Sequence, residues 1–568
     1  MRGLTPLMDA ADQAEFAQLE PRVARHLLLY DEHTWGSAES ISAPDAVHSL
    51  GQWNSKALQA YEAAAGAQRL WTLSARTLAG AIENADPAVL LFNPLPYPVK
   101  QHAVLPKLRG PEEFGGAWPL HEFARDLEMA NPISPLYVAG PPVDYGLVTI
   151  PAGGYCTLTL APREPQSVVT MDRWRMQNRW WDLRINPRTG AVSQLISRVD
   201  GYDWCDPDSS YGLADFVAHR LEHPQGRPYL QPGNPPRDVR PDLLIREGRV
   251  ERVTHYHTST GPGLRTLALR LETPHLRSLE MRYTLYDDEP WIDIAITLDR
   301  DESRHLESFY WVFPFRLNDS TFHYSQGGAV ITGEEEQLPN ACRDYYAVED
   351  FAALSTPERH VVLMTPDIPL VLWGDFTVGA YQEHHAPHTP ALISWPMNNY
   401  WHTNFKADQS GTLNFRYRLL LGQGPFHANA AMLQARAFAL PLMAYPTLRS
   451  SAGQTGHPPA TPQPAASSFI QCDPTVVRVL QCRTLEDRDG GRTLQLVFWG
   501  ESTVDATRIR FGGGWQLTHS AVVDLNGHIL RELVVQENSV VLPATRGTIT
   551  ALECAIKHEP SHGQNSTH

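Results

Sequence analysis

The sequence predicts a mainly β protein with an N-terminal helical region, namely a helical bundle followed by antiparallel β-sandwich domains. Over roughly the first 88 residues, apolar side chains recur every three or four positions, which is the helical period. Beyond them, short apolar or alternating runs lie between turn residues, with no alternation of strand and helix. The 46 prolines and 39 glycines, about 15% of the 568 residues, supply the many turns that such a fold requires.

Residues 1–87 are expected to form the helical region. We expect a first helix over 6–29, interrupted at Pro21, and a second from about residue 42 to 85, where Asp45 has the position of the acidic member of a capping box. A helix of some 40 residues needs partners along its length, so a bundle is expected. Three glycines inside the second helix weigh against its being unbroken: Gly51, Gly66 and Gly80.

The β-rich part divides into a small β-domain over 88–165 and a large β-sandwich domain over 166–446. Its expected strands include LRTLALRLE (264–272), WIDIAITLD (291–299), FYWVFPFRL (309–317) and LNFRYRLLL (413–421). Asn186-Pro187-Arg188-Thr189-Gly190 is predicted to be a turn between two strands.

The C-terminal part begins with a Pro-rich linker over 447–468, which carries no charge between Ser450 and Ser468. Residues 469–558 are expected to form a C-terminal β-sandwich, and 559–568 a disordered tail.

Composition excludes several classes of partner. With 47 Lys and Arg against 63 Asp and Glu, the net charge is −16, which disfavours nucleic acid and anionic membranes. No run approaches 18 apolar residues, and no secretory signal is visible at the N-terminus. The six cysteines include no CxxC pair and form no disulfide framework, so a cytoplasmic setting is expected.

The first candidate site is Asp31-Glu32-His33-Thr34-Trp35-Gly36, in the break between the two helical blocks. Two carboxylates beside an imidazole can ligate a divalent cation, and a carboxylate beside an indole can hold a sugar. The alternative is a polar connector with Trp35 packed beneath it.

The second candidate is the segment Trp395–Phe405, which holds four aromatic residues and three amides and includes Asn399 and Tyr400. It suits carbohydrate as well as it suits an ordinary sandwich edge with buried rings. Glu383-His384-His385-Ala386-Pro387-His388 matches no common zinc spacing and is expected to be a solvated loop.

Several segments together resemble the α-mannosidases of glycoside hydrolase family 38. The resemblance runs from Asp31–Gly36, with Trp53 and Lys56, to the end of the sandwich regions, in the order of the family. Its further segments are VLLFNPLPYP (89–98), NRWWDLRINPRTGAVSQL (178–195), FYWVFPFRL (309–317), EQLPNACRDYYAVEDFAAL (336–354), MNNYWHTNF (397–405) and VVLPATRGTITALEC (540–554).

The resemblance implies retaining, zinc-dependent hydrolysis of α-mannosidic bonds in mannose-containing glycans, and a galactose-mutarotase-like supersandwich. It makes Asp31, Glu32, Trp35, Asn399 and Tyr400 candidate sugar-binding residues. His33 is the candidate zinc ligand, although a gapless match would place Asp31 or Glu32 there.

The chain departs from the family where catalysis occurs. No segment resembles the family's N-terminal barrel, which holds the nucleophile, the acid and most zinc ligands, so we assign no catalytic residue. We therefore expect the chain to be inactive alone. Two alternatives are a subunit of a split mannosidase that docks a separate barrel chain, and a non-catalytic carbohydrate-binding β-sandwich protein.

Overall fold

The chain folds into two compact units. In the computed structural model, unit 1 comprises residues 1–32, 57–164 and 441–568, and unit 2 comprises 33–56 and 165–440. The structure describes residues 8–32, 37–82, 88–108, 138–159, 173–222, 244–261, 263–377, 382–387, 389–399, 404–447, 464–473, 477–486, 492–500, 506–524, 526–543 and 547–558.

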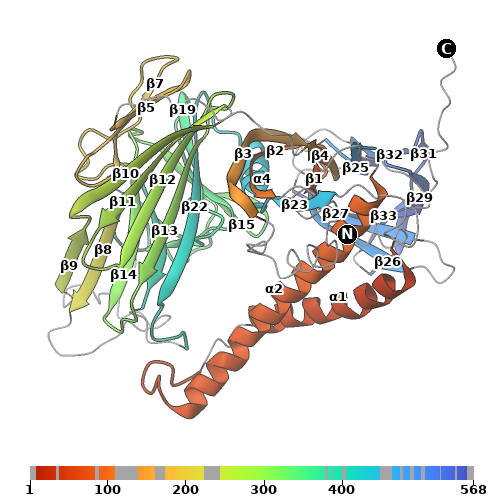
Figure 1. Cartoon of the computed structure of the whole chain (residues 1–568), viewed down its shortest axis with the longest axis horizontal. Helices are drawn as coiled ribbons and strands as arrows, with labels where there is room; N and C mark the ends of the chain where they lie inside the picture. The colour runs from red at the N-terminus through yellow and green to blue at the C-terminus, as the bar shows by residue number, and fades with distance from the viewer. Residues whose placement is uncertain are drawn as a thin grey trace. The chain divides into compact units, whose positions relative to one another are not determined.

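The expected mainly β fold with an N-terminal helical region is confirmed (Figure 1). The domain boundaries drawn from the sequence stay predictions. The expected tail over 559–568, and residues 448–463 of the expected linker, lie outside the described residues.

The helical region of unit 1 is an antiparallel pair made by α1 (Ala10–Asp31) and the part of α2 (Val47–Ala81) from residue 57 onward. Phe16 of α1 packs with Leu70 and Leu73 of α2 in a small apolar cluster. A Cβ atom at Gly66 would collide with the Val23 side chain, so this glycine lets the two helices approach closely.

Two expectations for these helices are wrong. The first helix is not interrupted at Pro21, because packing against α2 on both sides of the proline outweighs the single hydrogen bond that proline cannot make. The second helix runs through all three glycines but begins at Val47, after the expected cap. Asp45 does not cap it, since its carboxylate is paired with Arg304.

The C-terminal end of α2 packs on a small sheet of unit 1. Ala75, Leu78 and Ile82 contact Leu90 and Phe92 of this sheet in one apolar cluster. The sheet has the strand order β23 (Met443–Thr447), β1 (Ala88–Asn93), β4 (Gly154–Thr159), β24 (Ala466–Ser468), and β2 (Val99–Leu108) pairs with β3 (Val138–Ile150) nearby in the sequence.

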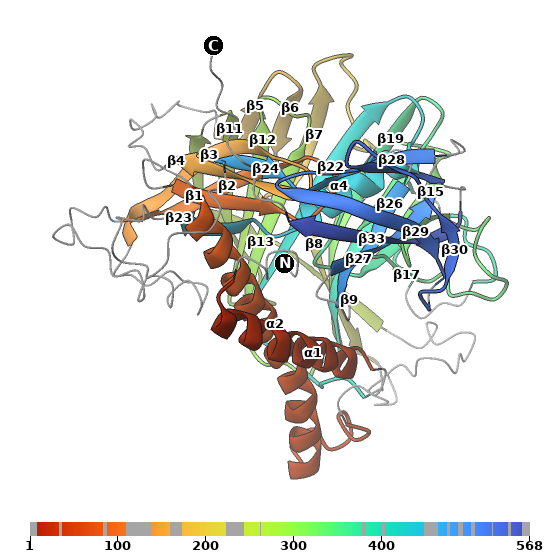
Figure 2. The same cartoon turned by 90° about the vertical axis from the view of Figure 1, so that its right-hand side faces the viewer.

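The rest of unit 1 is a sandwich of two sheets around its own apolar core, as Figure 2 shows for the strands at the blue end of the chain. One sheet has the order β25 (Ile470–Gln471), β28 (Ala506–Phe511), β32 (Ser539–Pro543), β31 (Val535–Gln536). The other has the order β26 (Val477–Glu486), β27 (Arg492–Gly500), β33 (Ile549–His558), β29 (Trp515–Val523), β30 (Ile529–Glu532).

Unit 2 is dominated by a larger sandwich. Its nine-stranded sheet has the order β10 (Arg252–Gly261), β11 (Leu264–Glu272), β12 (Ser278–Tyr286), β13 (Ile292–Arg300), β22 (Gly411–Gln423), β19 (Arg359–Met364), β18 (Phe351–Ser355), β15 (Thr321–Gln326), β16 (Ala329–Thr332). Its six-stranded sheet has the order β17 (Tyr346–Ala347), β20 (Leu370–Trp373), β21 (Ala391–Asn398), β14 (Glu307–Pro314), β8 (Asp215–Glu222), β9 (Leu244–Arg249). The strand pairings in both sheets are antiparallel.

Strand β14 lies at the centre of the six-stranded sheet and is buried on both faces. Phe309, Trp311 and Phe313 point into the main core between the two sheets, while Tyr310 and Val312 join a second cluster on the opposite face. This double burial explains why the segment is apolar throughout instead of alternating.

Smaller elements complete unit 2. A three-stranded sheet of β5 (Arg175–Gln177), β6 (Trp181–Ile185) and β7 (Val192–Ser197) adds residues to the main core, and α4 (Ala428–Ala439) packs on β18 and β19. The predicted turn over 186–190 is confirmed: the Asn186 side chain accepts the Arg188 N–H, and Gly190 has a φ of 76°.

Candidate functional site

A pocket of about 240 Å³ opens within unit 2 beside the first turns of α2. One wall comes from the loop before α2 and from α2 itself, and includes Ser40, Asp45, Ser49, Leu50 and Trp53. The other wall comes from two loops of the large sandwich, the β13–β14 connection and the segment before β22, and includes Glu302, Arg304, Lys406, Asp408 and Ser410.

An ion pair joins the two walls. The Arg304 guanidinium binds the Asp45 carboxylate with both terminal nitrogens, at 2.6 and 2.7 Å, and a third contact reaches Glu302 at 3.3 Å. This hydrogen bonding with Asp45 raises the Arg304 pKa above its ordinary value. Because two-pronged arginine–carboxylate pairs fix orientation as well as distance, Arg304 holds the loop before α2 on the sandwich.

Serine hydroxyl groups form the inner part of the first wall. Ser40 and Ser49 are buried, and Ser40 Oγ donates to the Ser37 carbonyl oxygen at 2.5 Å and lies 3.2 Å from the Asn404 carbonyl oxygen. Ser37 Oγ lies 3.4 Å from Ser49 Oγ. The loop that follows the first candidate segment is therefore bonded to the loop that contains the second.

A buried polar network supports the second wall. Arg300 is 4% exposed and donates to Glu307 at 2.6 Å and to the Gln409 carbonyl oxygen at 3.2 Å. Ser303 donates to the same Glu307 carboxylate at 3.1 Å. The network therefore anchors both loops that bear the charged pocket residues, at Ser303 and at Gln409.

The structure describes three of the six predicted site residues, and these three differ in exposure and in hydrogen bonding. Asp31 ends α1 and Glu32 follows it, both exposed and both in unit 1. Asn399 is buried; its Oδ1 accepts the Glu307 N–H at 2.7 Å, and its Nδ2 donates to the Ser303 carbonyl oxygen at 3.0 Å. The other three predicted residues, His33, Trp35 and Tyr400, lie outside the described residues.

Two further segments differ from what their composition suggested. Trp395 is 1% exposed and stacks on Tyr310, so it belongs to the core and is no exposed platform. His385 is buried, with Nε2 2.6 Å from the Trp373 carbonyl oxygen, which makes the expected solvated loop wrong at that residue. In the part of the chain that the structure describes, no three His, Cys, Asp or Glu side chains gather as metal ligands.

Most of the pocket residues were missed in the sequence. Trp53 appeared there only as part of the family resemblance, and Arg304, Lys406 and Asp408 lie in short polar turns that resemble any solvated loop. Asp45 and Arg304 are 259 positions apart. Only the fold brings them together.

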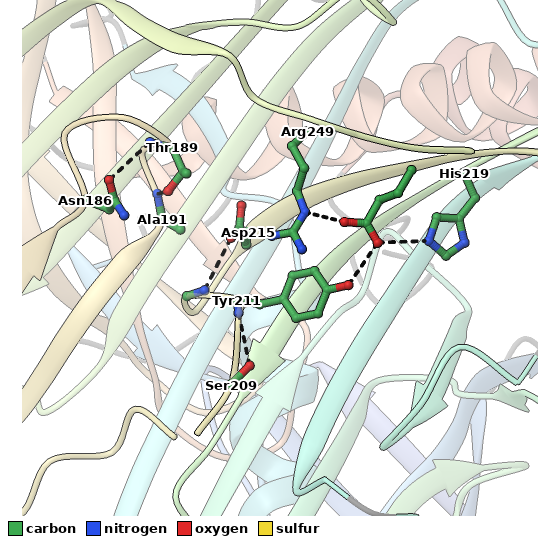
Figure 3. Close-up of polar contacts among 10 residues, drawn as sticks. Asn186, Thr189, Ala191, Ser209, Tyr211, Asp215, His219 and Arg249 are labelled. Carbon is green, nitrogen blue, oxygen red and sulfur yellow. Dashed lines mark hydrogen bonds and ion pairs between the residues drawn. The ribbon is translucent and has the colours of Figure 1, made fainter. Parts of the chain in front are cut away.

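A second polar cluster ties the edge strand β9 to β8 (Figure 3). Arg249 Nη1 lies 3.4 Å from Asp215 Oδ2, and Arg249 Nε donates to Glu247 at 2.6 Å. Glu247 also accepts from the Tyr211 hydroxyl at 3.0 Å and lies 3.7 Å from His219 Nε2. Since Arg249 and Glu247 of β9 are bonded to side chains of β8 and of the loop before it, the cluster fastens β9.

The two carboxylates of this cluster, Asp215 and Glu247, have pKa values shifted in opposite directions. Burial raises the pKa of Asp215 to about 6, and its Oδ1 has no hydrogen-bond partner. The neighbouring His219, followed by Arg249, lowers the pKa of Glu247 to about 2. Glu247 is therefore ionised at neutral pH and is a poor proton donor.

The Asp215 pKa predicts a specific pH dependence of stability. Because the folded pKa of about 6 exceeds the ordinary 3.8, the stability that Asp215 contributes is greatest below pH 3.8 and is lost as the pH rises through 6. Between about pH 4.5 and 7 this loss amounts to about 2 kcal/mol. Asp215→Asn should remove that part of the slope in urea unfolding followed by tryptophan fluorescence.

Glu247→Gln is the matched control, with the opposite sign. The Glu247 contribution is fully present above pH 4.5 and is lost as the pH falls through 2, so this variant should lose most stability at pH 7 and less at pH 3. An unchanged slope in Asp215→Asn would show that this carboxyl is not the group responsible.

The fold is similar to that of two solved structures. The chain matches the crystal structure of a protein in glycosyl hydrolase family 38 from Enterococcus faecalis with a TM-score of 0.54 and 11% identity, over 89% of this chain and 62% of that chain. It matches an alpha-mannosidase from Enterococcus faecalis V583 with a TM-score of 0.54 and 10% identity, over 89% of this chain and 60% of that chain. The expected resemblance is thus confirmed for the fold.

The other comparisons add less. A galactose mutarotase-like protein from Lactobacillus casei ATCC 334 matches 44% of this chain with a TM-score of 0.25, a likeness too weak to build on. No protein-family model and no curated protein matches the sequence. None of the helices over the described ranges is both long and apolar enough to cross a membrane.

Proposed function

We propose that this chain is the helical and β-sandwich part of an α-mannosidase of glycoside hydrolase family 38, and that it acts on α-mannosides together with a catalytic barrel. The observation that supports this is the match over 89% of the chain to two such proteins, of which the chain spans about 60%. The proposal includes retention of configuration, which requires two closely spaced carboxyl groups. We assign neither of them to the described residues.

The proposal gives the candidate residues different roles. Asp31, Glu32, Trp35 and Tyr400 remain proposed sugar contacts, and His33 the proposed zinc ligand. Asn399 is proposed to position the β13–β14 connection, because its carboxamide is bonded at both ends to backbone groups. The resemblance to family 38 implies that the remaining zinc ligands come from the barrel.

We test the proposal by producing this chain alone and together with the polypeptide encoded immediately upstream, where we expect the barrel. Hydrolysis of para-nitrophenyl α-D-mannopyranoside with zinc chloride is expected only when both are present. The corresponding α-glucoside is the control substrate. Hydrolysis by the chain alone would contradict its proposed dependence on a barrel, and failure of the combined preparation would contradict the proposed activity.

A second candidate is a non-catalytic carbohydrate-binding protein. It is favoured by the pocket beside α2, which is lined by an indole, hydroxyls and carboxylates of this chain alone. Saturable binding of mannosides by the chain, without hydrolysis in any combination, would favour this candidate.

A further inference from the structure

The pocket beside α2 contains an uneven set of charges. The described residues of its lining include three carboxylates, Asp45, Glu302 and Asp408, and two cations, Arg304 and Lys406. Both cations already have partners: Arg304 binds Asp45 and Glu302, and Lys406 Nζ lies 3.6 Å from Asp408 Oδ1. Among the described residues of the lining, an anionic ligand would face one excess negative charge and no unpaired cation, so these residues disfavour anions.

Asp408 is the carboxylate best placed to serve a ligand. It is 5% exposed and yet lines the pocket, so its position is fixed by the surrounding protein. Its ion pair with Lys406, at 3.6 Å, is longer than a charge-assisted hydrogen bond. A hydroxyl donor of a ligand can therefore bond to it more closely than the lysine does.

The opposite side of the pocket is partly apolar. Trp53 and Leu50 of α2 both line it, and the buried Ser40 adds a hydroxyl group. An aromatic face combined with a carboxylate and hydroxyls suits a molecule that has apolar C–H faces and hydroxyl edges, as a sugar ring has. A small organic cation is the competing occupant, because indole faces also attract cations.

We propose that this pocket is a binding site for one neutral sugar residue, held by Asp408 and Trp53, and that it discriminates against sugars that carry a phosphate or carboxylate group. The inference rests on the proposed function for its substrate class and goes further in naming the residues and the selectivity. Arg304 acts as a positioning residue, because it keeps Asp45 and the loop before α2 in place.

Calorimetric titration of the full chain tests the binding. Methyl α-D-mannopyranoside should bind, and mannose 6-phosphate should bind at least about tenfold more weakly, because its phosphate would meet the excess negative charge of the lining. Asp408→Asn and Trp53→Ala should each weaken methyl mannoside about tenfold, whereas Trp53→Phe should retain most of the affinity. Trp174→Phe, a change in the same unit outside the pocket lining, should leave the affinity unchanged.

Each other outcome has a defined meaning. Equal affinity for the phosphorylated sugar, preference for choline, or wild-type affinity in a folded Asp408→Asn chain would overturn the inference. So would the absence of mannoside binding. If the combined preparation hydrolyses mannosides while both pocket variants bind and react as wild type, the pocket inference fails and the proposed function stands. If the chain binds mannosides with the expected selectivity but the combined preparation does not hydrolyse them, the pocket inference stands and the proposed function fails.

Discussion

Arg418→Met is expected to lower the free energy of unfolding of the large sandwich by about 3 kcal/mol, because it leaves the Asp293 carboxylate without its partner on the face of the nine-stranded sheet opposite the main core, where this side chain is only 18% exposed. Arg418 is 4% exposed and binds Asp293 through two nitrogens, at 2.6 and 2.7 Å, directly across β13 and β22. Its guanidinium also lies 4.1 Å from the centre of the Trp291 ring, and Tyr286 donates to the same carboxylate. Urea unfolding followed by tryptophan fluorescence measures the effect.

The sandwich offers a matched control for this prediction. Arg270 and Glu280 are also paired directly across two strands, but both side chains are more than half exposed. Arg270→Met should therefore cost no more than about 1 kcal/mol. The double variant Arg418→Met with Asp293→Leu should be more stable than Arg418→Met alone, since no charge is then left unpaired. Equal losses in the two single variants would show that burial does not set the cost.

Arg300→Met is expected to destabilise the same sandwich by about 3 kcal/mol and to weaken sugar binding in the pocket beside α2. The change leaves the Glu307 carboxylate, which is 8% exposed, without the guanidinium that binds it at 2.6 Å. It also removes the bond to the Gln409 carbonyl oxygen, next to Asp408. Unfolding in urea and calorimetric titration with methyl α-D-mannopyranoside report the two effects separately.

Glu307→Gln removes the negative charge from the Arg300–Glu307 pair but retains the shape of the side chain. A glutamine retains the size of the side chain and an oxygen that can accept from Arg300 and Ser303, so we expect it to cost less than Arg300→Met. If Arg300→Met unfolds the sandwich completely at room temperature, Glu307→Gln still tests the network through the affinity of the pocket. Wild-type stability and affinity in both variants would refute the proposed support of the pocket wall.

The β-strands were the part of the fold that the sequence predicted best. The run LRTLALRLE became β11 with the same ends, because Leu267, Leu269 and Leu271 occupy every second position and face the core, and pairing with the neighbouring strands needs that register. The turn at 186–190 was equally local, since asparagine and glycine satisfy its bonds without help from the rest of the chain.

Helix boundaries were predicted less well, because tertiary contacts compete with local signals. Pro21 should stop a helix by itself, yet α1 continues through it where the flanking side chains pack on α2. Asp45 has the spacing of a capping residue, yet its carboxylate binds Arg304 from a distant loop.

By itself, the sequence determined the mainly β class, the N-terminal helices and many strand positions, because periodicity and turn chemistry are local properties. The likeness in fold to family 38 glycoside hydrolases came from the resemblance of several segments in the order of that family. Only the tertiary structure decided which polar residues form a site. It buried Trp395 and His385, engaged the Asn399 carboxamide with backbone groups, and placed Asp408 beside Trp53. A pocket depends on contacts between segments hundreds of positions apart, and neither composition nor spacing records such contacts.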